Sequence, residues 1–246
     1  MNLFGLIGRN ISYSFSKKYF SDKFNSEKIQ NTSYQTFDLN EISEIEKLIQ
    51  NKNLKGLNVT IPYKEQIIPF LDKLSPEAEK IGAVNCIKIQ RDAENNPILI
   101  GFNTDAYGFE NSLKPLLESY HQKALILGDG GAAKAIKYVL DKLDIPHTSI
   151  TRNGKFLYSD LTQEIIQDHP IIINSTPLGT FPDVENEPYI PYEFLSDQHL
   201  LYDLIYNPEK TQFLKNGELK GAKIKNGYEM LVLQAEKSWE IWNQPL

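Results

Sequence analysis

Short apolar runs alternate with segments of helical periodicity along the first part of the chain. Apolar runs at Asn2–Gly8 and Leu54–Thr60, and alternating residues over Thr32–Leu39, predict three β-strands. Apolar residues recur at helical spacing in a segment that ends near Phe24 and again over Glu41–Gln50, which predicts a helix after each of the first two strands. This order of strand, helix and strand is typical of an α/β domain.

The pattern becomes less regular after Lys64. Short helical stretches are predicted up to Leu71 and over Pro76–Ile81, and they are followed by strands at Gly82–Ile89 and Ile98–Gly101. We therefore expect the first part of the chain to form one α/β unit.

A new pattern begins at Asp105. Helical spacing of apolar residues predicts a helix over Asp105–Ser119, and we place the domain boundary there. The next strand, Ala124–Leu127, leads into a glycine-rich turn and a helix that continues through Leu140. Further strands are predicted at His147–Thr151, Pro170–Asn174, Leu200–Leu204 and Ala222–Ile224. Strands that alternate with helices in this way favour a parallel sheet.

The last predicted helix runs from about Gly227 to Trp242 and has one mostly apolar side. Gln234 lies within that side. A glutamine in such a place needs a hydrogen-bonding partner, which comes either from the core or from a ligand.

The composition restricts the class of protein. With 246 residues, 41% of them hydrophobic, the chain suffices for one large or two medium domains, and disordered and collagen-like classes are excluded. A formal net charge of -6 argues against a broad nucleic-acid-binding surface. No segment approaches the roughly 20 apolar residues that span a bilayer, and the single cysteine, Cys86, fits a reducing compartment. We therefore expect a cytoplasmic protein without nucleic-acid or membrane partners.

The segment from Asn58 to Lys64 brings several polar side chains to the end of a predicted strand. Its sequence is NVTIPYK. Pro62 lacks a backbone N–H and restricts Ile61, so the strand should end near Thr60 and Lys64 should lie in the first turn of the next element. Taken alone, the pattern fits a strand-to-helix corner with an exposed lysine as well as it fits a catalytic turn.

Two serines stand at the start of the first predicted helix. Ser14 and Ser16 follow the first strand in a polar loop. Hydroxyls beside the free backbone amides of a helix start can hold an anion such as a carboxylate. The alternative is that one serine caps the helix and the other faces solvent.

A glycine-rich turn precedes the helix that ends near Leu140. Residues 128–133 read GDGGAA between a predicted strand and this helix, which is a small-residue form of the dinucleotide-binding fingerprint. Gly128 would permit the tight turn and Gly130 the close approach of a pyrophosphate. Asp129 would repel a pyrophosphate unless its carboxylate points to solvent. A glycine-rich turn without a ligand is the alternative.

Basic residues follow the next predicted strand. Thr151 is followed by Arg152, with Lys155 close behind, and no acidic residue stands where the 2′-hydroxyl of an NAD ribose would be bound. Arginine can bind the 2′-phosphate of NADP, so this pattern indicates NADP, and a solvated basic turn is the alternative. The strand after that ends in a polar turn around Thr176, at the edge where parallel sheets bind ligands.

The motifs in their order resemble the shikimate dehydrogenase family over essentially the whole chain. They are SxS at 14–16, NVTIPYK at 58–64, GAVN at 82–85, NTD at 103–105, GDGGAA at 128–133, NSTPLG at 174–179 and NGYEMLVLQA at 226–235. Each motif alone is weak evidence, but the ordered series is highly specific.

The resemblance implies a two-domain α/β fold. A substrate domain would comprise residues 1–104 and 228–246, so that the last helix returns to it, and a Rossmann-like NADP-binding domain would comprise residues 105–227. It also implies reversible hydride transfer between NADPH and 3-dehydroshikimate, which gives shikimate in aromatic amino-acid biosynthesis. The implied partner is this small-molecule substrate alone, without a metal, in a monomer or homodimer.

The family motifs imply roles for individual residues. Lys64 and Asp105 would be the catalytic pair, in which Lys64 polarises the ketone and handles its proton while Asp105 positions Lys64. The substrate-binding residues would be Ser14, Ser16, Thr60, Asn85, Gln234 and Tyr206. The cofactor-binding residues would be Gly128, Gly130, Gly131, Ala132, Thr151, Arg152, Lys155, Thr176, Leu204 and Gly227.

The first motif departs from the family pattern. Where the family commonly has Pro, His, Pro and His, this chain has Asn10, Tyr13, Lys17 and Phe20. Together with Asp129, these departures leave open an altered affinity or a related substrate such as quinate. A quinate/shikimate enzyme that prefers NAD is a rival of the same class, and Arg152 argues against it. A nucleotide-binding sensor that kept the fold and lost turnover is a further alternative, but retention of both Lys64 and Asp105 argues against it.

Overall fold

The computed structural model describes residues 1–11 and 14–245, and the chain divides into two units. The first unit consists of residues 1–104 and 235–246, and the second of residues 105–234. Helix α9 (Tyr228–Asn243) therefore contributes residues 228–234 to the second unit and residues 235–243 to the first.

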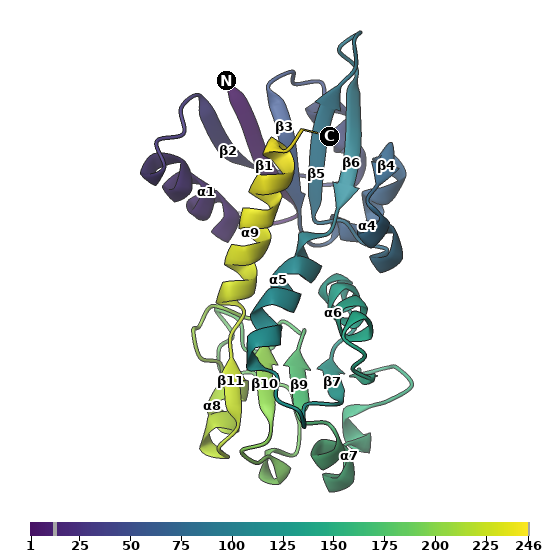
Figure 1. Cartoon of the computed structure of the whole chain (residues 1–246), viewed down its shortest axis with the longest axis vertical. Coiled ribbons are helices and arrows are strands. Elements are labelled where there is room, and N and C mark those ends of the chain that lie inside the picture. Colours follow the sequence, from purple (N-terminus) through teal and green to yellow (C-terminus); the bar gives the residue numbers. More distant parts are fainter. Residues whose placement is uncertain (12–13, 246) are drawn as a thin grey trace. The chain divides into compact units, whose positions relative to one another are not determined.

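Within the described residues, a mixed six-stranded sheet forms the centre of the first unit (Figure 1). Its strands are β1 (Asn2–Gly8), β2 (Thr32–Asp38), β3 (Leu54–Val59), β4 (Lys73–Leu74), β5 (Cys86–Arg91) and β6 (Pro97–Phe102). Their order across the sheet is β2-β1-β3-β5-β6-β4. β1 pairs in parallel with β2 and β3, whereas β5 is antiparallel to both of its neighbours.

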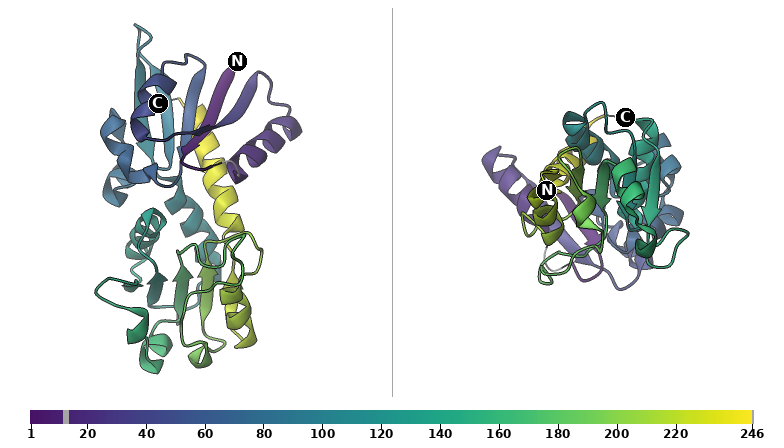
Figure 2. Two further views of the ribbon diagram at one scale, coloured as in Figure 1. Left: turned by 180° about the vertical axis from the view of Figure 1, so that it is seen from behind. Right: turned by 90° about the horizontal axis from the view of Figure 1, so that it is seen from below.

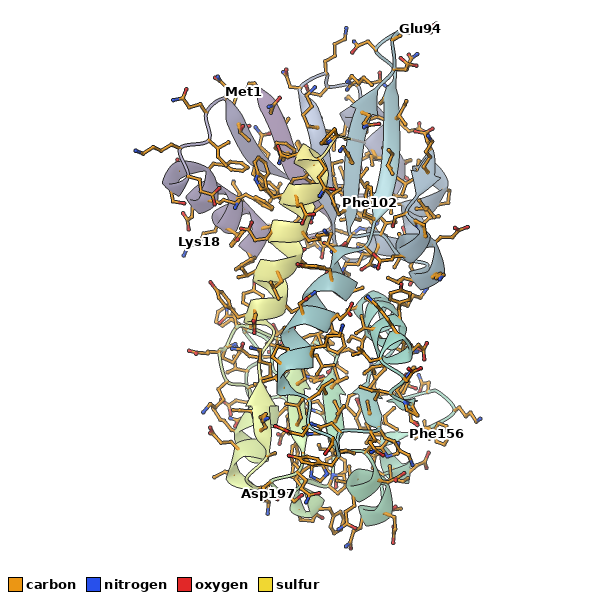
Figure 3. The ribbon with its side chains drawn as sticks, viewed as in Figure 1. Met1, Lys18, Glu94, Phe102, Phe156 and Asp197 are labelled. Atoms are coloured by element: carbon orange, nitrogen blue, oxygen red, sulfur yellow. The ribbon has the colours of Figure 1, made fainter. Side chains whose placement is uncertain are left out.

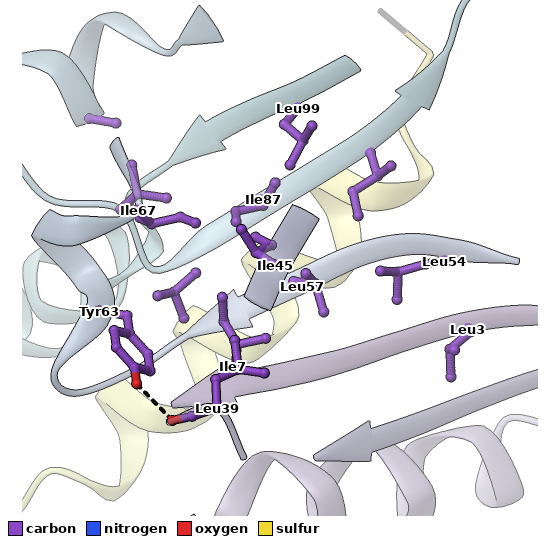
Figure 4. Packing of buried hydrophobic residues seen from close by; sticks show 14 residues of the cluster. Leu3, Ile7, Leu39, Ile45, Leu54, Leu57, Tyr63, Ile67, Ile87 and Leu99 are labelled. Atoms are coloured by element: carbon purple, nitrogen blue, oxygen red, sulfur yellow. Dashed lines mark hydrogen bonds between the residues drawn. The ribbon is translucent and has the colours of Figure 1, made fainter. Parts of the chain in front are cut away.

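Because side chains alternate along each strand, buried apolar residues lie on both faces of this sheet, and helices cover both faces. The helices are α1 (Phe15–Ser26), α2 (Ile45–Leu48), α3 (Tyr63–Gln66) and α4 (Pro76–Ile81), with 3₁₀ turns at Ile42–Glu44 and Ile68–Phe70. Helix α1 and the end of α9 cover one face (Figures 1 and 2), where Phe4 of β1 packs with residues of both helices. On the other, Ile7 of β1 packs with Ile45 of α2 and Tyr63 of α3 (Figure 4).

Trp242 fixes the end of α9 to the sheet. Its indole Nε1 donates a hydrogen bond to the carbonyl of Ile87 over 3.0 Å, and its ring stacks on Phe4 with centroids 4.8 Å apart. A Cβ on Gly56 would lie 2.3 Å from the same indole nitrogen, so glycine in β3 permits this close approach. The C-terminal part of α9, residues 235–243, is therefore part of the core of the first unit.

The second unit contains a parallel sheet, which the described residues form with five strands. The strands are β7 (Ala124–Leu127), β8 (His147–Ile150), β9 (Ile171–Asn174), β10 (Leu200–Asp203) and β11 (Lys223–Lys225). Their order is β11-β10-β9-β7-β8, the doubly wound order in which the direction of the winding reverses between β7 and β9. The helices are α5 (Thr104–Leu113), α6 (Gly131–Lys142), α7 (Gln163–Asp168) and α8 (Gln212–Leu219), with 3₁₀ turns at Lys114–Leu116, Tyr158–Asp160 and Tyr192–Phe194.

Helix α5 packs on β10 through one aromatic pair. The rings of Phe109 and Tyr202 meet edge to face with centroids 5.1 Å apart, and the Tyr202 hydroxyl shares a 2.7 Å hydrogen bond with Ser112. Both hydroxyls are buried; that of Ser112 also donates to the carbonyl of Gly108 over 2.7 Å, and Ser112 is the partner that the Tyr202 hydroxyl needs. Leu125 and Leu201 of the sheet join Phe213 of α8 in a cluster of buried apolar residues.

Two predicted elements end or begin elsewhere than the apolar pattern indicates. The strand predicted at Gly82–Ile89 begins only at Cys86, because Gly82, with a φ of 67°, ends α4 in the left-handed conformation. The helix predicted over Asp105–Ser119 ends at Leu113, and a 3₁₀ turn that contains Pro115 follows it.

Other short elements differ from the predicted ones or were not predicted. The helix expected over Glu41–Gln50 is a 3₁₀ turn followed by the four-residue α2. Strand β4 has only two residues and α7 only six, so neither shows a recognisable hydrophobic period.

Candidate functional site

The first unit brings two of the predicted motifs to the same edge of its sheet. β1 and β3 are parallel neighbours, with β2 on the outer side of β1. Residues 9–11 leave the carboxyl end of β1, and the turn from Thr60 to Lys64 leaves that of β3. Loops at such a reversal of strand order form the usual binding crevice of open α/β sheets.

Hydrogen bonds tie these two loops together. The backbone amide of Thr60 donates to Ile7 over 2.9 Å, and that of Arg9 donates to Ile61 over 3.2 Å. The Arg9 side chain also donates to the hydroxyl of Tyr63, which in turn donates to the carbonyl of Leu39 over 2.7 Å (Figure 4). The turn that carries Lys64 is therefore fixed relative to the loop that follows β1.

Lys64 lies half-buried in α3, beside the GAVN segment. Its carbonyl accepts a 2.7 Å hydrogen bond from Val84, and the carbonyl of Asn85 accepts one of 2.8 Å from Val59. Thr60, Lys64 and Asn85 are thus brought together on one edge of the first unit.

Ser14 and Ser16 lie at the start of α1, as the pattern predicts. Ser14 is the N-cap, and its hydroxyl accepts a hydrogen bond from the backbone of Lys17 over 3.3 Å. Ser16 is half-buried in the first turn. Tyr13, one of the departures from the family pattern, lies outside the described residues, whereas Phe20 is buried and stacks on Tyr34 with centroids 4.6 Å apart.

A buried chain of hydroxyl and amide groups runs behind these residues, and sequence reasoning missed it. Tyr34 donates to Oδ1 of Asn58 over 2.8 Å, and Nδ2 of Asn58 donates to Ser238 over 2.9 Å and to the carbonyl of Asn85 over 3.3 Å. Ser238 shares a 3.1 Å hydrogen bond with Thr104. Only the position of Asn58 at a strand end hinted at a polar role.

Both ends of the Asn85 side-chain amide hydrogen-bond to the first residue of α5. Its Oδ1 accepts the backbone amide of Thr104 over 2.6 Å, and its Nδ2 donates to the Thr104 hydroxyl over 3.0 Å. Thr104 closes the first unit, and Asp105, 8% exposed, opens the second. Because Lys64 and Asp105 belong to different units, their pairing stays a prediction.

The second unit places the glycine-rich turn at its own strand-order reversal. Gly128 follows β7 with a φ of 103°, a left-handed conformation that favours glycine. A Cβ there would lie 2.9 Å from the Ser175 hydroxyl and 3.0 Å from the Thr176 methyl, so the turns after β7 and β9 lie against each other. The predicted residues Gly128 and Thr176 are thus brought together.

The start of α6 fits a dinucleotide pyrophosphate. Among the described residues, no side chain caps this 12-residue helix, and no atom lies within 4 Å of where a Cβ on Gly130 would stand. Open space above unpaired amides at a helix start suits a phosphate group. Gly131 and Ala132 form the first turn.

Asp129 carries a countercharge of its own. Its carboxylate forms a 2.5 Å ion pair with Lys137, two turns further along α6. The two side chains are 53% and 30% exposed. The repulsion expected from Asp129 is therefore reduced by a lysine that the fingerprint did not indicate.

The basic residues after β8 lie in an exposed loop. Arg152 and Lys155 are exposed, and Lys155 lies over the ring of Phe156, which is labelled in Figure 3. Among the described residues, the buried hydroxyl of Thr151 has no hydrogen-bond partner. A Cβ on Gly154 would lie 2.2 Å from that hydroxyl, so the loop folds closely over Thr151.

A buried carboxylate supports the turn after β9, and no local sequence signal marks it. Asp203 accepts hydrogen bonds from the side chains of Thr211 at 2.6 Å and Asn174 at 3.0 Å, and from the backbone of Ile205. Burial raises the pKa of Asp203 to about 6, although these hydrogen bonds oppose the rise. Asn174 also accepts from the Thr176 hydroxyl over 2.6 Å, so Asp203 helps to position Thr176.

The remaining predicted residues lie near β10 and α9. A Cβ on Gly227 would lie 2.1 Å from the carbonyl of Leu204, so these two residues are in close contact. Tyr206 is 38% exposed, and partial burial raises its pKa. Gln234 is buried and donates to the carbonyl of Leu231 over 2.9 Å.

Two classes of site are not found in the described part of the chain. None of its helices is long and apolar enough to cross a bilayer. Its His, Cys, Asp and Glu residues form no group of three that could hold a metal ion.

Comparison with known proteins agrees with this arrangement. Residues 6–87 match the family model described as the shikimate dehydrogenase substrate binding domain. The chain is 40% identical to the shikimate dehydrogenase (NADP(+)) of Clostridium beijerinckii, in an alignment that covers 99% of this chain and 93% of that protein.

Solved structures are similar over the same length. The crystal structure of shikimate dehydrogenase 1 from Peptoclostridium difficile is 39% identical with a TM-score of 0.80, covering 98% of this chain and 91% of that one. Shikimate 5-dehydrogenase from Thermus thermophilus, in complex with NADP(H) and shikimate, is 29% identical with a TM-score of 0.85, covering 100% and 95%. Because it is 40% identical to the Clostridium beijerinckii enzyme over 99% of its length, the chain belongs to the shikimate dehydrogenase family.

Proposed function

We propose that this protein catalyses the reversible, NADP-dependent reduction of 3-dehydroshikimate to shikimate. One observation carries the proposal. The motifs assigned to the substrate follow β1 and β3, where the strand order of the first sheet reverses, and the glycine-rich turn and the turn around Thr176 follow β7 and β9, where that of the second sheet reverses. The relatives from Clostridium beijerinckii and Thermus thermophilus, which match across the whole chain, carry this activity or these ligands in their names.

The first unit supplies the substrate residues. The hydroxyls of Ser14 and Ser16, beside the start of α1, bind the substrate carboxylate. Thr60 and Asn85 order the ring hydroxyls from the ends of β3 and β5. The ammonium of Lys64 donates a hydrogen bond to the ketone oxygen and then its proton, as the oxygen gains negative charge during reduction.

The second unit supplies the cofactor residues. Gly128, Gly130 and the first turn of α6 hold the pyrophosphate, and Arg152 with Lys155 holds the 2′-phosphate. NADPH, when bound, supplies the hydride that the substrate carbon receives. Asp105 and Gln234 complete the substrate site, with Asp105 orienting the Lys64 ammonium for proton transfer.

The test is a comparison of wild type with Lys64→Ala in shikimate oxidation, with NADP⁺ and NAD⁺ as cofactors and quinate as a second substrate. We expect wild type to prefer shikimate and NADP⁺. Loss of the proton-transfer group should lower kcat by about 10²–10⁴-fold with little change in KM for shikimate. A fully active Lys64→Ala would refute the mechanism, and a preference for quinate with NAD⁺ would establish the alternative function.

The cellular setting is part of the proposal. We place the enzyme in the cytoplasm as a monomer or homodimer, which suits a chain whose one cysteine, Cys86, is buried and reduced. Light scattering of the purified chain distinguishes the two assemblies.

A further inference from the structure

Tyr34 lies on β2, outside the motifs of the family, and is 5% exposed. Its ring stacks on Phe20 with centroids 4.6 Å apart and an interplanar angle of 17°. Its hydroxyl donates to Oδ1 of Asn58 over 2.8 Å. A buried hydroxyl needs a partner, and this partner is a residue of the segment that carries Thr60 and Lys64.

Asn58 is the group on which Tyr34 acts. The amide is 4% exposed, and its two ends differ because Oδ1 only accepts hydrogen bonds whereas Nδ2 only donates them. With Oδ1 held by Tyr34, Nδ2 faces the carbonyl of Asn85 and the hydroxyl of Ser238. The Asn85 carbonyl can only accept, so it determines that Nδ2 faces it, and the Tyr34 hydroxyl holds the opposite end of the amide in place.

The ring of Tyr34 also contacts α1, which carries Ser16 in its first turn, because the ring stacks on Phe20. Burial raises the pKa of Tyr34 well above its usual value. Tyr34 therefore connects α1, through Phe20, with the end of β3 and the residue before β5, through Asn58. Ser16, Thr60 and Asn85, three of the proposed substrate ligands of the first unit, lie on or next to these segments.

We propose that Tyr34 is a positioning residue for shikimate, acting through Asn58 to hold the end of β3 and the residue before β5 in register. This inference rests on the proposed function. Tyr34 itself touches no reacting atom. Its role is to keep the ligands of the bound substrate at fixed separations, so that affinity does not require ordering them at each binding event.

Tyr34→Phe removes the hydroxyl and keeps the ring that stacks on Phe20. Tyr202→Phe is the matched control, because it also deletes a buried tyrosine hydroxyl with one strong side-chain partner, Ser112, but in the second unit. Ser238→Ala is a second probe, since it removes the hydroxyl to which Nδ2 of Asn58 donates. Each variant is measured as the full chain for Tm, for KM and kcat with shikimate, and for KM with NADP⁺.

We expect the Tm values of Tyr34→Phe and Tyr202→Phe to fall by similar amounts, since each loses one buried hydrogen bond. Only Tyr34→Phe should raise KM for shikimate, by about three- to tenfold, with KM for NADP⁺ unchanged. Ser238→Ala should change KM for shikimate in the same direction.

A Tyr34→Phe variant whose KM for shikimate stays within about twofold of that of Tyr202→Phe would overturn the inference and leave Tyr34 a structural residue. If Tyr34→Phe does not fold, a KM for shikimate of Ser238→Ala that stays within about twofold of that of Tyr202→Phe would overturn the inference instead. A wild-type protein that does not oxidise shikimate at all would instead refute the proposed function.

Discussion

Oδ1 of Asn85 accepts the first backbone amide of α5, that of Thr104, over 2.6 Å. The first amides of a helix have no partner within the helix, so a side chain from elsewhere in the fold fills this position. The residue after Thr104 is Asp105. A residue proposed to bind substrate therefore also fixes where the helix that carries the proposed catalytic carboxylate begins.

Removal of this acceptor should affect stability and turnover together. We expect Asn85→Ala to lower the free energy of unfolding by about 1–3 kcal/mol, because the buried amide of Thr104 loses its partner. The free energy is measured by urea denaturation, with kcat measured alongside. Asn85→Asp keeps the acceptor and should retain more of both quantities; equal loss in the two variants would count against the capping role.

Gly108 should not tolerate a methyl group. A Cβ there would lie 2.5 Å from the carbonyl of Met230 and 3.2 Å from the amide of Gln234, where α5 and α9 cross. Because backbone atoms cannot swing away, we expect Gly108→Ala to cost about 1–3 kcal/mol of stability and to raise KM for shikimate through displacement of Gln234.

Gly217→Ala is the control for this substitution. Its Cβ would meet the end of the Leu201 side chain at 2.4 Å, and a leucine can change rotamer. A loss of stability as large as that of Gly108→Ala would show that the backbone contact with Met230 is not the cause.

The ion pair between Asp129 and Lys137 should govern cofactor binding rather than folding. Exposed pairs contribute about 0–1 kcal/mol to stability, so both partners can be replaced. We expect Lys137→Met to weaken NADP⁺ and NAD⁺ binding alike by about three- to tenfold, since an unpaired carboxylate then stands beside the pyrophosphate. Titration by fluorescence measures both affinities. The double variant with Asp129→Asn should return to the wild-type value, and failure to do so would exclude charge compensation.

Arg152 should distinguish the two cofactors. A charged hydrogen bond to a phosphate contributes about 1.5–3 kcal/mol, so Arg152→Ala should raise KM for NADP⁺ by about 10- to 100-fold and leave KM for NAD⁺ nearly unchanged. Lys155→Ala serves as the comparison and should have a smaller effect. An equal change for both cofactors would mean that Arg152 does not bind the 2′-phosphate.

Asp203 should give a distinctive pH dependence of stability. Its pKa in the folded protein is about 6, above the ordinary 3.8, so the fold favours the protonated carboxyl. This contribution is fully present below pH 3.8 and is lost as the pH rises through about 6.

The change in this contribution between about pH 4.5 and 7 is on the order of 2 kcal/mol. We therefore expect the stability advantage of wild type over Asp203→Asn to shrink by about that amount across this interval. Urea denaturation of both proteins at the two pH values measures it. A constant difference would show that Asp203 does not titrate in this range.

Local sequence was sufficient for much of the fold. The boundaries of β1, α4 and β7 agree with their predicted residues, since apolar runs bounded by Gly or Pro are local signals. The serine cap at the start of α1 and the glycine turn after β7 follow from residue types at fixed spacing.

Other features depend on residues that meet only after folding. Asn58 has partners on β2, before β5 and on α9, and the last of these, Ser238, is 180 residues away in the chain. Asp203 supports the turn after β9 through Asn174, which lies on the neighbouring strand and donates to it, so sequence alone does not reveal its role. The pairing of Asp129 with Lys137 depends on the path of the turn after β7 as well as on α6, so helical spacing alone does not predict it.

The packing of Trp242 on Phe4 and Gly56 affects the order in which the chain can fold. Domains generally fold as they are synthesised, the N-terminal one first. Here the core of the first unit includes residues 235–243, which the ribosome adds only after the entire second unit. During translation, Phe4 of β1 therefore lacks its packing against Trp242 until α9 is made, so the first unit can complete its core only after the second unit has been synthesised.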